Sequence, residues 1–399
     1  VSHKLAAAIE RAPALRDYPS SAAIFLPDGR PLRPGEVMRN PDLASTFRRI
    51  AAEGRDGFYA GEVARAIARC SERLGGLLAL EDLAAYRMLW QDPISTTYRG
   101  HTVHEVPPNS SGFILLEELN LVEQFDLASL GCGTAESVHL MVEAKRLAFA
   151  DRERYVADID AAQIPIRGLI SKEYARERAR HINPERALPT PIAAGDPWRW
   201  HHPDEDTTCF AVVDRWGNAV CELQSLHSGF GSGVVADGTG VLLNNRMAYW
   251  HLDPSHPNVL APGKRVRHTM NPAMVFRDGA LHLVLGTPGG DTQVQTNLQL
   301  VTGMLDYGMT PQEAVEAPRW RHVQPSAEPK VPHAGGDLLQ LEARFPDDTR
   351  RGLSRRGHYL QVLDAWGGPG SAVAIQVDAA AGVLHGAADP RQDGYAAGW

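Results

Sequence analysis

A chain of 399 residues with 43% hydrophobic and 22% charged residues has the composition of an ordinary globular protein, and it is too long for one simple core. The formal charge of −8 leaves no basic footprint for nucleic acid, and no segment reaches the roughly eighteen consecutive apolar residues of a membrane helix, so neither partner is expected. Residues 1–16 are Ala-rich and amphipathic without a signal peptide's apolar core or cleavage site, which slightly favours the cytoplasm.

The first half of the chain is predicted to be mostly helical. Apolar residues recur at helical spacing over residues 40–67, with a break at a Gly/Asp turn around residues 54–57. A short helix at 80–86 leads into a strand at 94–98, and a turn connects this strand to an alternating strand at 101–106.

A long helix and a linker complete this half. The segment Pro107 to Gly112 ends the second strand and opens a helix, and a longer helix runs from an N-cap at Thr134 to about Tyr155. Its predicted apolar side consists of Val138, Met141, Val142 and Leu147. Residues 189–206 form a polar linker with the pair His201-His202. The pair is interpreted as part of a solvated loop, so neither a metal nor another cofactor is expected.

After residue 206 the pattern becomes rich in strands. Strands at 210–213 and 219–223 face each other across a five-residue turn, and Cys209 and Cys221 flank this hairpin either as a bridge or as two buried thiols. The later predicted elements are a hairpin at Asp278-Gly279 between strands 274–276 and 281–285, helices near 292–304 and 311–317, and a closing hairpin over 372–386. A helical half followed by a strand-rich half that also contains helices predicts an α+β fold, with layered sheets covered by helices.

The doublet Thr207-Thr208 opens the strand-rich half. Such a doublet is ordinary at the start of a strand, because threonine favours β-structure. A threonine hydroxyl becomes a competent nucleophile when the residue is the first of a chain, since its own amine then serves as the base. Cleavage between Asp206 and Thr207 would leave pieces of 206 and 399 − 206 = 193 residues.

Three glycine-rich segments follow Thr207, and the last of them, residues 367–370, is interpreted as a loop. The first, Gly229 to Gly240, has neither the spacing of a dinucleotide fingerprint nor that of a serine nucleophile elbow. The second, Gly286 to Asp291, lies between an apolar strand and a helix. Consecutive N–H groups of Gly289 and Gly290 at that helix start can stabilise the oxyanion of an acyl transfer. A tight turn that binds nothing is the alternative.

Several further motifs occur in a fixed order. In the first half they are 57–62, 81–86 and 107–112, and in the second half 207–220, 230–233, 239–245, 262–265, 288–290, 317–319 and 388–391. In this order they resemble the γ-glutamyltranspeptidases. The resemblance covers residues 207–399 nearly throughout and extends back over about 40–187.

The resemblance implies an N-terminal-nucleophile hydrolase with a four-layer αββα sandwich, made as a precursor that cuts itself between Asp206 and Thr207. Residues 1–206 would be the large-subunit part and 207–399 the small-subunit part of a heterodimer. Thr207 would be the nucleophile and its amine, with a pKa of about 7.7–8.0, the base. Ser225 matches a second hydroxyl that hydrogen-bonds the nucleophile, and Gly289 with Gly290 matches the oxyanion pair.

The residues that would bind the substrate's head group depart from the family pattern. Tyr249 stands where an acidic residue usually binds an α-ammonium, and Arg246 where Gln or Glu is usual. His268-Thr269 replaces a Ser-Ser pair, and His227 replaces an Asn. Arg246 would repel an ammonium and attract a carboxylate. The family's early segment, which carries an arginine for the α-carboxylate, has no counterpart here.

These features predict an autoprocessing threonine amidohydrolase or acyltransferase that cleaves a small-molecule amide through an acyl-enzyme. γ-Glutamyl amides such as glutathione are the first substrate expectation. The alternatives are a related acylase that acts on a different acidic amide, and a catalytically impaired pseudoenzyme or binding protein.

Overall fold

The computed structural model describes residues 1–200, 211–323 and 337–398, so Asp206, Thr207 and the pair His201-His202 lie outside the described residues. The chain forms two compact units, one made of Val1–Leu89 with Ser225–Met247 and the other of Trp90–Gln224 with Ala248–Trp399. The predicted division between residues 206 and 207 concerns chain cleavage and stays a prediction.

The smaller unit is helical and contains one short strand pair. Its elements are α1 (His3–Glu10), η1 (Pro13–Arg16), α2 (Pro19–Phe25), η2 (Pro27–Gly29), α3 (Pro41–Glu53), α4 (Arg55–Tyr59), α5 (Glu62–Arg73), α6 (Leu80–Ala85), β5 (Val235–Ala236) and β6 (Val241–Leu242). Neighbouring side chains of β5 point to opposite sides, as in any strand. Val235 packs with Ile9 and Leu15, whereas Ala236 packs with Val63 and Ile67 of α5. The segment 225–247 thus holds two groups of helices together.

The larger unit is built on an antiparallel sheet of six strands in the order β1-β2-β7-β8-β12-β13. The strands are β1 (Ile94–Tyr98), β2 (His101–Glu105), β7 (Ala273–Arg277), β8 (Ala280–Gly286), β12 (Val373–Asp378) and β13 (Val383–Ala388). Asp278 and Gly279 connect β7 to β8 with φ of 51° and 78°, the backbone that a two-residue hairpin requires. This predicted hairpin and the closing one are confirmed.

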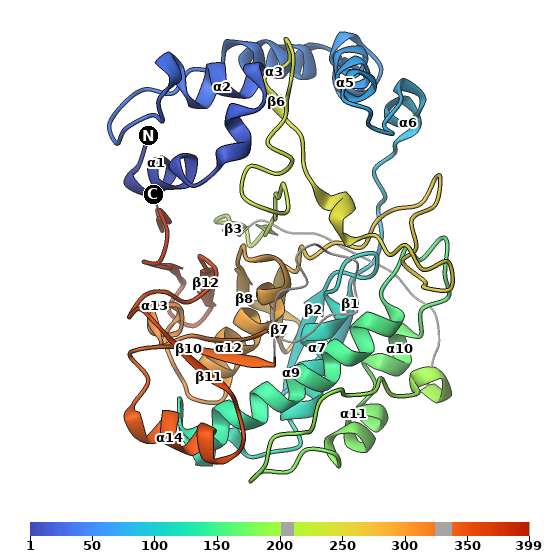
Figure 1. Ribbon diagram of the computed structural model, residues 1–399. Helices are drawn as coiled ribbons and strands as arrows, with labels where there is room; N and C mark the ends of the chain where they lie inside the picture. The colour runs from blue at the N-terminus through green and yellow to red at the C-terminus, as the bar shows by residue number, and fades with distance from the viewer. Residues whose placement is uncertain (201–210, 324–336, 399) are drawn as a thin grey trace. The chain divides into compact units, whose positions relative to one another are not determined.

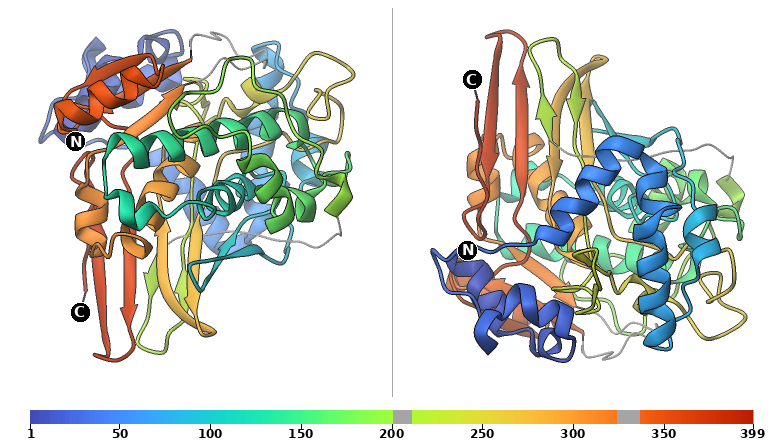
Figure 2. Two further views of the ribbon diagram at one scale, coloured as in Figure 1. Left: turned by 90° about the horizontal axis from the view of Figure 1, so that it is seen from below. Right: turned by 90° about the horizontal axis from the view of Figure 1, so that it is seen from above.

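The two faces of this sheet pack against different layers (Figures 1 and 2). Leu283 and Leu285 of β8 join the core formed with helices α7 (Phe113–Val122), α9 (Ala135–Tyr155) and α12 (Gln293–Leu305). Val284 points the other way and packs with Cys221, next to the pair β3 (Val212–Val213) and β4 (Ala219–Val220). A helix layer, a sheet and a second sheet therefore follow one another, which confirms the predicted α+β class. Cys221 is a free, buried thiol, and Cys209 lies outside the described residues.

Helix α9 begins after the predicted N-cap, where the Thr134 side chain accepts a hydrogen bond from Ser137 N at 3.2 Å. The prediction of a single apolar side is wrong, because the helix is buried on nearly every side. Its charged residues are kept inside by ion pairs. Arg146 Nη1 lies 2.7 Å from Glu143, and Arg178 Nε lies 3.2 Å from Asp151. Apolar periodicity alone cannot reveal such pairs.

Two late motifs of the sequence form a buried ionic network in this unit. Arg319 Nη1 lies 2.5 Å from Asp389 Oδ2, and Arg391 Nε lies 2.7 Å from Glu342 Oε1. Arg319 Nη1 also donates to the Pro369 carbonyl at 3.0 Å. Since each of these charges has a partner, the network fixes the strands and loops that it joins.

The remaining elements include several that add residues to the same core. They are α8 (Leu127–Leu130), α10 (Ile166–Leu169), α11 (Lys172–Ala179), η3 (Pro197–Trp200), η4 (Arg246–Tyr249), η5 (Gly290–Thr292), α13 (Pro311–Glu316), β9 (Trp320–Val323), β10 (Leu338–Glu342), α14 (Asp347–Arg355) and β11 (Leu360–Leu363). Strand β10 pairs parallel with β11 and antiparallel with β9 in a three-stranded sheet. Among the described helices, none combines the length and the apolar character that crossing a bilayer would require.

Candidate active site

The Gly289-Gly290 turn lies between β8 and α12 and has a backbone that only glycine adopts readily. Gly289 has φ of 136° and Gly290 has φ of 57°. Thr292 closes the turn, because its N–H and its hydroxyl both donate to the Gly289 carbonyl, at 3.1 and 2.8 Å. Within the described parts of the chain, neither glycine N–H donates a hydrogen bond. Two backbone donors therefore stand available at the start of a helix, where negative charge is favoured.

Tyr249 lies beside this turn and is part of a buried charged cluster. A Cβ added to Gly290 would lie 3.8 Å from the Tyr249 hydroxyl oxygen. That hydroxyl donates to Asp291 Oδ1 at 3.0 Å, and Arg152 Nη1 lies 3.0 Å from the same oxygen. The guanidinium of Arg267 sits over the Tyr249 ring, 4.3 Å from its centre. The position expected to hold an ammonium-binding acid is thus lined by two arginines.

Burial and pairing set the charge states in this cluster. Burial opposes ionisation of Arg152, but Asp291 and Glu153 outweigh it and raise the pKa of Arg152 above its ordinary value. Burial, followed by the charge of Arg152, lowers the pKa of Arg267. Burial would raise the pKa of Glu153, yet Arg152 and Arg267 lower it overall. Two guanidiniums and two carboxylates thus balance one another behind the turn.

His268 and Thr269 lie on an extended segment that the motif Pro107 to Gly112 holds in place. Asn109 O accepts a hydrogen bond from His268 N at 2.9 Å, and Ser111 Oγ donates to His268 O at 3.2 Å. Two residues further on, Asn271 N donates to the side chain of Gln293 at 2.9 Å, in the first turn of α12. The segment is therefore anchored to the helix that follows the glycine pair.

Ser225, His227 and Arg246 form a second group, in the smaller unit. Ser225 Oγ accepts a hydrogen bond from Arg246 Nη2 at 3.1 Å and another from His227 N at 2.9 Å. The His227 ring pairs with Asn245, with 3.1 Å between Nδ1 and Oδ1. His227 has a positive φ of 79°, which turns the chain back onto Ser225. The predicted second hydroxyl and the substituted arginine are thus direct partners.

The structure thus gathers the predicted residues into two groups. Tyr249, Gly289 and Gly290 lie together in the larger unit, where His268 and Thr269 are linked to the same helix start, whereas Ser225, His227 and Arg246 lie together in the smaller one. The assigned roles of all eight, and those of Asp206 and Thr207 outside the described residues, stay predictions. Ala211, four positions after Thr207, packs against the sheet beside Cys221 and Val284.

Asp291, Arg152 and Arg267, which tie Tyr249 into the site, were not predicted from the sequence. Asp291 directly follows the glycine pair, and this position is the sequence signal that could have identified it. Arg152 and Arg267 come from distant parts of the chain, and their ring and ion-pair contacts emerge only in the folded unit.

Comparison with known proteins agrees with the motifs. The sequence profile of the family described as Gamma-glutamyltranspeptidase matches residues 1–399, further toward the N-terminus than the motifs reach. The chain is 39% identical over 388 residues to the glutathione hydrolase-like YwrD proenzyme of Bacillus subtilis (strain 168), covering 96% of this chain and 70% of that protein. It is 37% identical over 398 residues to the glutathione hydrolase proenzyme of Escherichia coli (strain K12), covering 96% and 66%.

A solved structure gives the same result for the fold. The crystal structure of cephalosporin acylase from Bacillus halodurans superposes with a TM-score of 0.86 at 36% identity and covers all of this chain and 71% of its own. The chain spans about two thirds of the length of these relatives. The N-terminal-nucleophile hydrolase fold inferred from the motifs is therefore confirmed, and the chain belongs to the γ-glutamyltranspeptidase family of amidohydrolases.

Proposed function

We propose that this protein is an autoprocessing threonine amidohydrolase that forms an acyl-enzyme on Thr207. The observation that carries the proposal is the Gly289-Gly290 turn, with two N–H groups directed by a strained backbone at the start of α12. Thr207 Oγ would attack the amide carbonyl while the Thr207 amine takes the hydroxyl proton. The oxyanion would form at the two glycine N–H groups, and its collapse would release the amine product with that proton. Water or a second amine would then take the acyl group.

Ser225 supports this assignment through its hydrogen-bond inventory. A serine hydroxyl has two acceptor sites and one hydrogen to donate. Arg246 and His227 N donate to the Ser225 oxygen and fill both acceptor sites, so the hydroxyl hydrogen is the group of Ser225 that can bond to the nucleophile. Donation to Thr207 Oγ is the role that the family resemblance assigns to it. Arg246 would strengthen that donation by drawing electron density from the hydroxyl oxygen.

We infer that the acyl group carries a carboxylate and lacks an α-ammonium, as in a glutaryl amide. Tyr249 has no carboxylate with which to bind an ammonium group. Arg152 lies beside its hydroxyl, through Asp291, and Arg267 lies over its ring, so the surroundings are positively charged. Arg246, which is buried next to Ser225 in the smaller unit, stands at a position where the family usually has a neutral or acidic side chain. γ-Glutamyl amides, the first substrate expectation, are the competing class and are favoured by the names of the two bacterial glutathione hydrolase relatives.

Two measurements test the proposal. Purified protein should yield a fragment that begins at Thr207 on N-terminal sequencing, and the Thr207→Ala variant should stay intact. Cleaved protein should hydrolyse glutaryl-p-nitroanilide faster than γ-glutamyl-p-nitroanilide, two substrates that differ only in the α-amino group. Faster turnover of the γ-glutamyl compound would show instead that the substrates are γ-glutamyl amides such as glutathione. An intact chain without acylation would show a pseudoenzyme or binding protein instead.

A further inference from the structure

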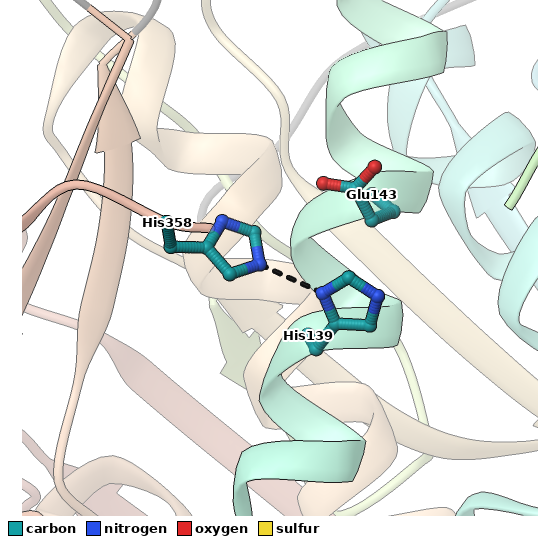
Figure 3. Close-up of side chains that lie close together, drawn as sticks. All are labelled: His139, Glu143 and His358. Carbon is teal, nitrogen blue, oxygen red and sulfur yellow. Dashed lines mark hydrogen bonds between the residues drawn. The ribbon is translucent and has the colours of Figure 1, made fainter. Parts of the chain in front are cut away.

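Two buried histidines and a glutamate meet beside the first half of α9, at a place that the proposed reaction does not use. His139 and Glu143 lie one helical turn apart on α9, and His358 lies between α14 and β11 (Figure 3). His139 Nδ1 and His358 Nε2 are 2.7 Å apart, and one ligand atom from each of the three residues lies within 4.8 Å of the others. All three side chains are buried.

The hydrogen bonds of His139 fix its tautomer. Its Nε2 lies 2.8 Å from the Asn183 carbonyl, which can only accept, so Nε2 carries the hydrogen. Nδ1 therefore presents a lone pair toward His358. A ring that donates one N–H to a backbone carbonyl and offers the other nitrogen is the usual arrangement of a histidine that ligates a metal.

The Glu143 carboxylate has acceptor sites that its hydrogen bonds do not fill. Its Oε1 accepts a hydrogen bond from Arg146 Nη1 at 2.7 Å, and its Oε2 accepts one from Leu188 N at 2.8 Å. Two carboxylate oxygens have about four acceptor sites, so each oxygen can still bind a cation. Arg146 competes for the same charge, and its second nitrogen pairs with Asp337 at 2.6 Å. This competition limits the affinity without blocking the ligand.

A cavity of about 670 Å³ reaches the cluster. Its lining includes His358, together with Asn183, Leu188 and Arg146, the groups that orient His139 and Glu143. The cavity provides a route for an ion and room for a water molecule beside it.

We propose that His139, Glu143 and His358 form a binding site for a divalent transition metal of the zinc class, with a water molecule from the cavity as fourth ligand. Two imidazoles and one carboxylate with an open fourth position are a known zinc ligand set. Two nitrogens on a tetrahedral zinc lie about 3.3 Å apart when each bond is about 2.0–2.1 Å, so the pair must widen by about 0.6 Å. The His358 hydrogen moves from Nε2 to Nδ1 through solvent, and the ring stays neutral.

Bound metal would join α9 to the turn before β11. His358 is 219 positions from His139 in the chain, so no local spacing in the sequence signals this site. The site departs from the expectation of no metal, which rested on the isolated pair His201-His202. It shares no residue with the proposed active site, so its failure would leave the proposed function untouched.

The test uses the full chain, without an affinity tag, freed of metal by a chelator and titrated with Zn²⁺ in a calorimeter. Wild type and Thr207→Ala should each bind one Zn²⁺ per chain, and Zn²⁺ should raise their melting temperature. His139→Gln and His358→Gln should lose the binding, and Glu143→Gln should weaken it by about tenfold or more. Glutamine at 358 keeps an N–H that can donate to His139 Nδ1, so this variant should stay folded.

A second probe and a matched control complete the test. Co²⁺ bound to the wild type should give the intense visible bands of a tetrahedral site, and His358→Gln should not. The double variant His201→Ala/His202→Ala should bind Zn²⁺ as the wild type does. The proposal is overturned if the wild type shows no saturable binding, if His358→Gln binds as tightly, or if the control variant is the one that loses the ion.

Discussion

Alanine at Gly289 should impair catalysis far more than alanine at Gly290, although both changes add one methyl group to the same turn. At Gly289 the φ of 136° lies outside the range that side-chain-bearing residues adopt easily, and the new Cβ would lie 2.4 Å from Thr292 Oγ1. At Gly290 the φ of 57° is left-handed helical, and the nearest atom, the Tyr249 hydroxyl oxygen, lies at an ordinary 3.8 Å.

The size of each effect follows from these geometries. Gly290→Ala should cost about 1–2 kcal/mol of stability, the usual penalty for a left-handed residue. Gly289→Ala should cost about 1–3 kcal/mol in backbone strain and about 1 kcal/mol more for the displaced Thr292 hydrogen bond. Relief of that strain turns the Gly289 N–H away from the oxyanion. Loss of one such donor costs about 10²–10³ in kcat.

The assay compares kcat for the p-nitroanilide that wild type prefers, on protein whose cleavage has been checked on a denaturing gel. Gly290→Ala should retain kcat within about tenfold of wild type, since its backbone can stay in place. Thr292→Ala serves as the control, because it removes the clashing hydroxyl and leaves both N–H groups. Equal kcat values for Gly289→Ala and Gly290→Ala, with both proteins cleaved, would refute the proposed oxyanion pair.

Three further predictions concern charge. Arg246→Gln should lower the ratio of kcat/KM for the glutaryl amide to that for the γ-glutamyl amide by about tenfold, which corresponds to the loss of one charged hydrogen bond. An unchanged ratio would show that Arg246 does not contact the acyl group. The free energy of unfolding should fall as pH drops below about 6.5, because the folded pKa of His358 is about 3 and the unfolded chain takes up the proton first. The slope should be about 1.4 kcal/mol per pH unit for this ring, and denaturant melts of His358→Gln should show a slope smaller by that amount. Burial raises the pKa of Glu118 to about 8, so this carboxyl group favours folding at low pH and loses that contribution as pH rises from about 4.3 to 8. Glu118→Gln should therefore gain stability relative to wild type at pH 8, and melts that show no such gain between pH 5 and 8 would contradict the assignment.

Elements governed by neighbours in the chain were predictable from the sequence. The N-cap at Thr134, the hairpin at Asp278-Gly279 and the turn before α12 depend on residue types within a few positions, and each occurs as expected. The sheet β11-β10-β9 was missed, because its parallel pair joins strands separated by α14 and no local pattern specifies that pairing.

In the candidate site, too, the features that depend on neighbouring residues could be predicted, and those that depend on distant residues could not. Gly289 and Gly290 could be singled out because they lie between a predicted strand and a predicted helix and belong to one of the ordered motifs. The pairing of Arg246 with Ser225 was not foreseen, since hydrogen bonding across 21 positions depends on the loop between them. The charged cluster around Tyr249 includes Arg152 of α9, which pairs with Asp291. Apolar periodicity does not mark a charged residue such as Arg152 as buried, so this cluster could not be predicted from the sequence.

The arrangement also explains how chemistry and specificity can change independently in this family. The oxyanion donors are backbone groups, so they depend on glycine conformation and tolerate new side chains around them. Head-group recognition depends on side chains, and here Tyr249 is bound to Asp291, which also pairs with Arg152. A carboxylate at position 249 would lie beside Asp291 and would leave that residue without its hydroxyl donor. Recovery of an ammonium site therefore requires changes in the buried cluster as well as at Tyr249, whereas the glycine turn can stay as it is.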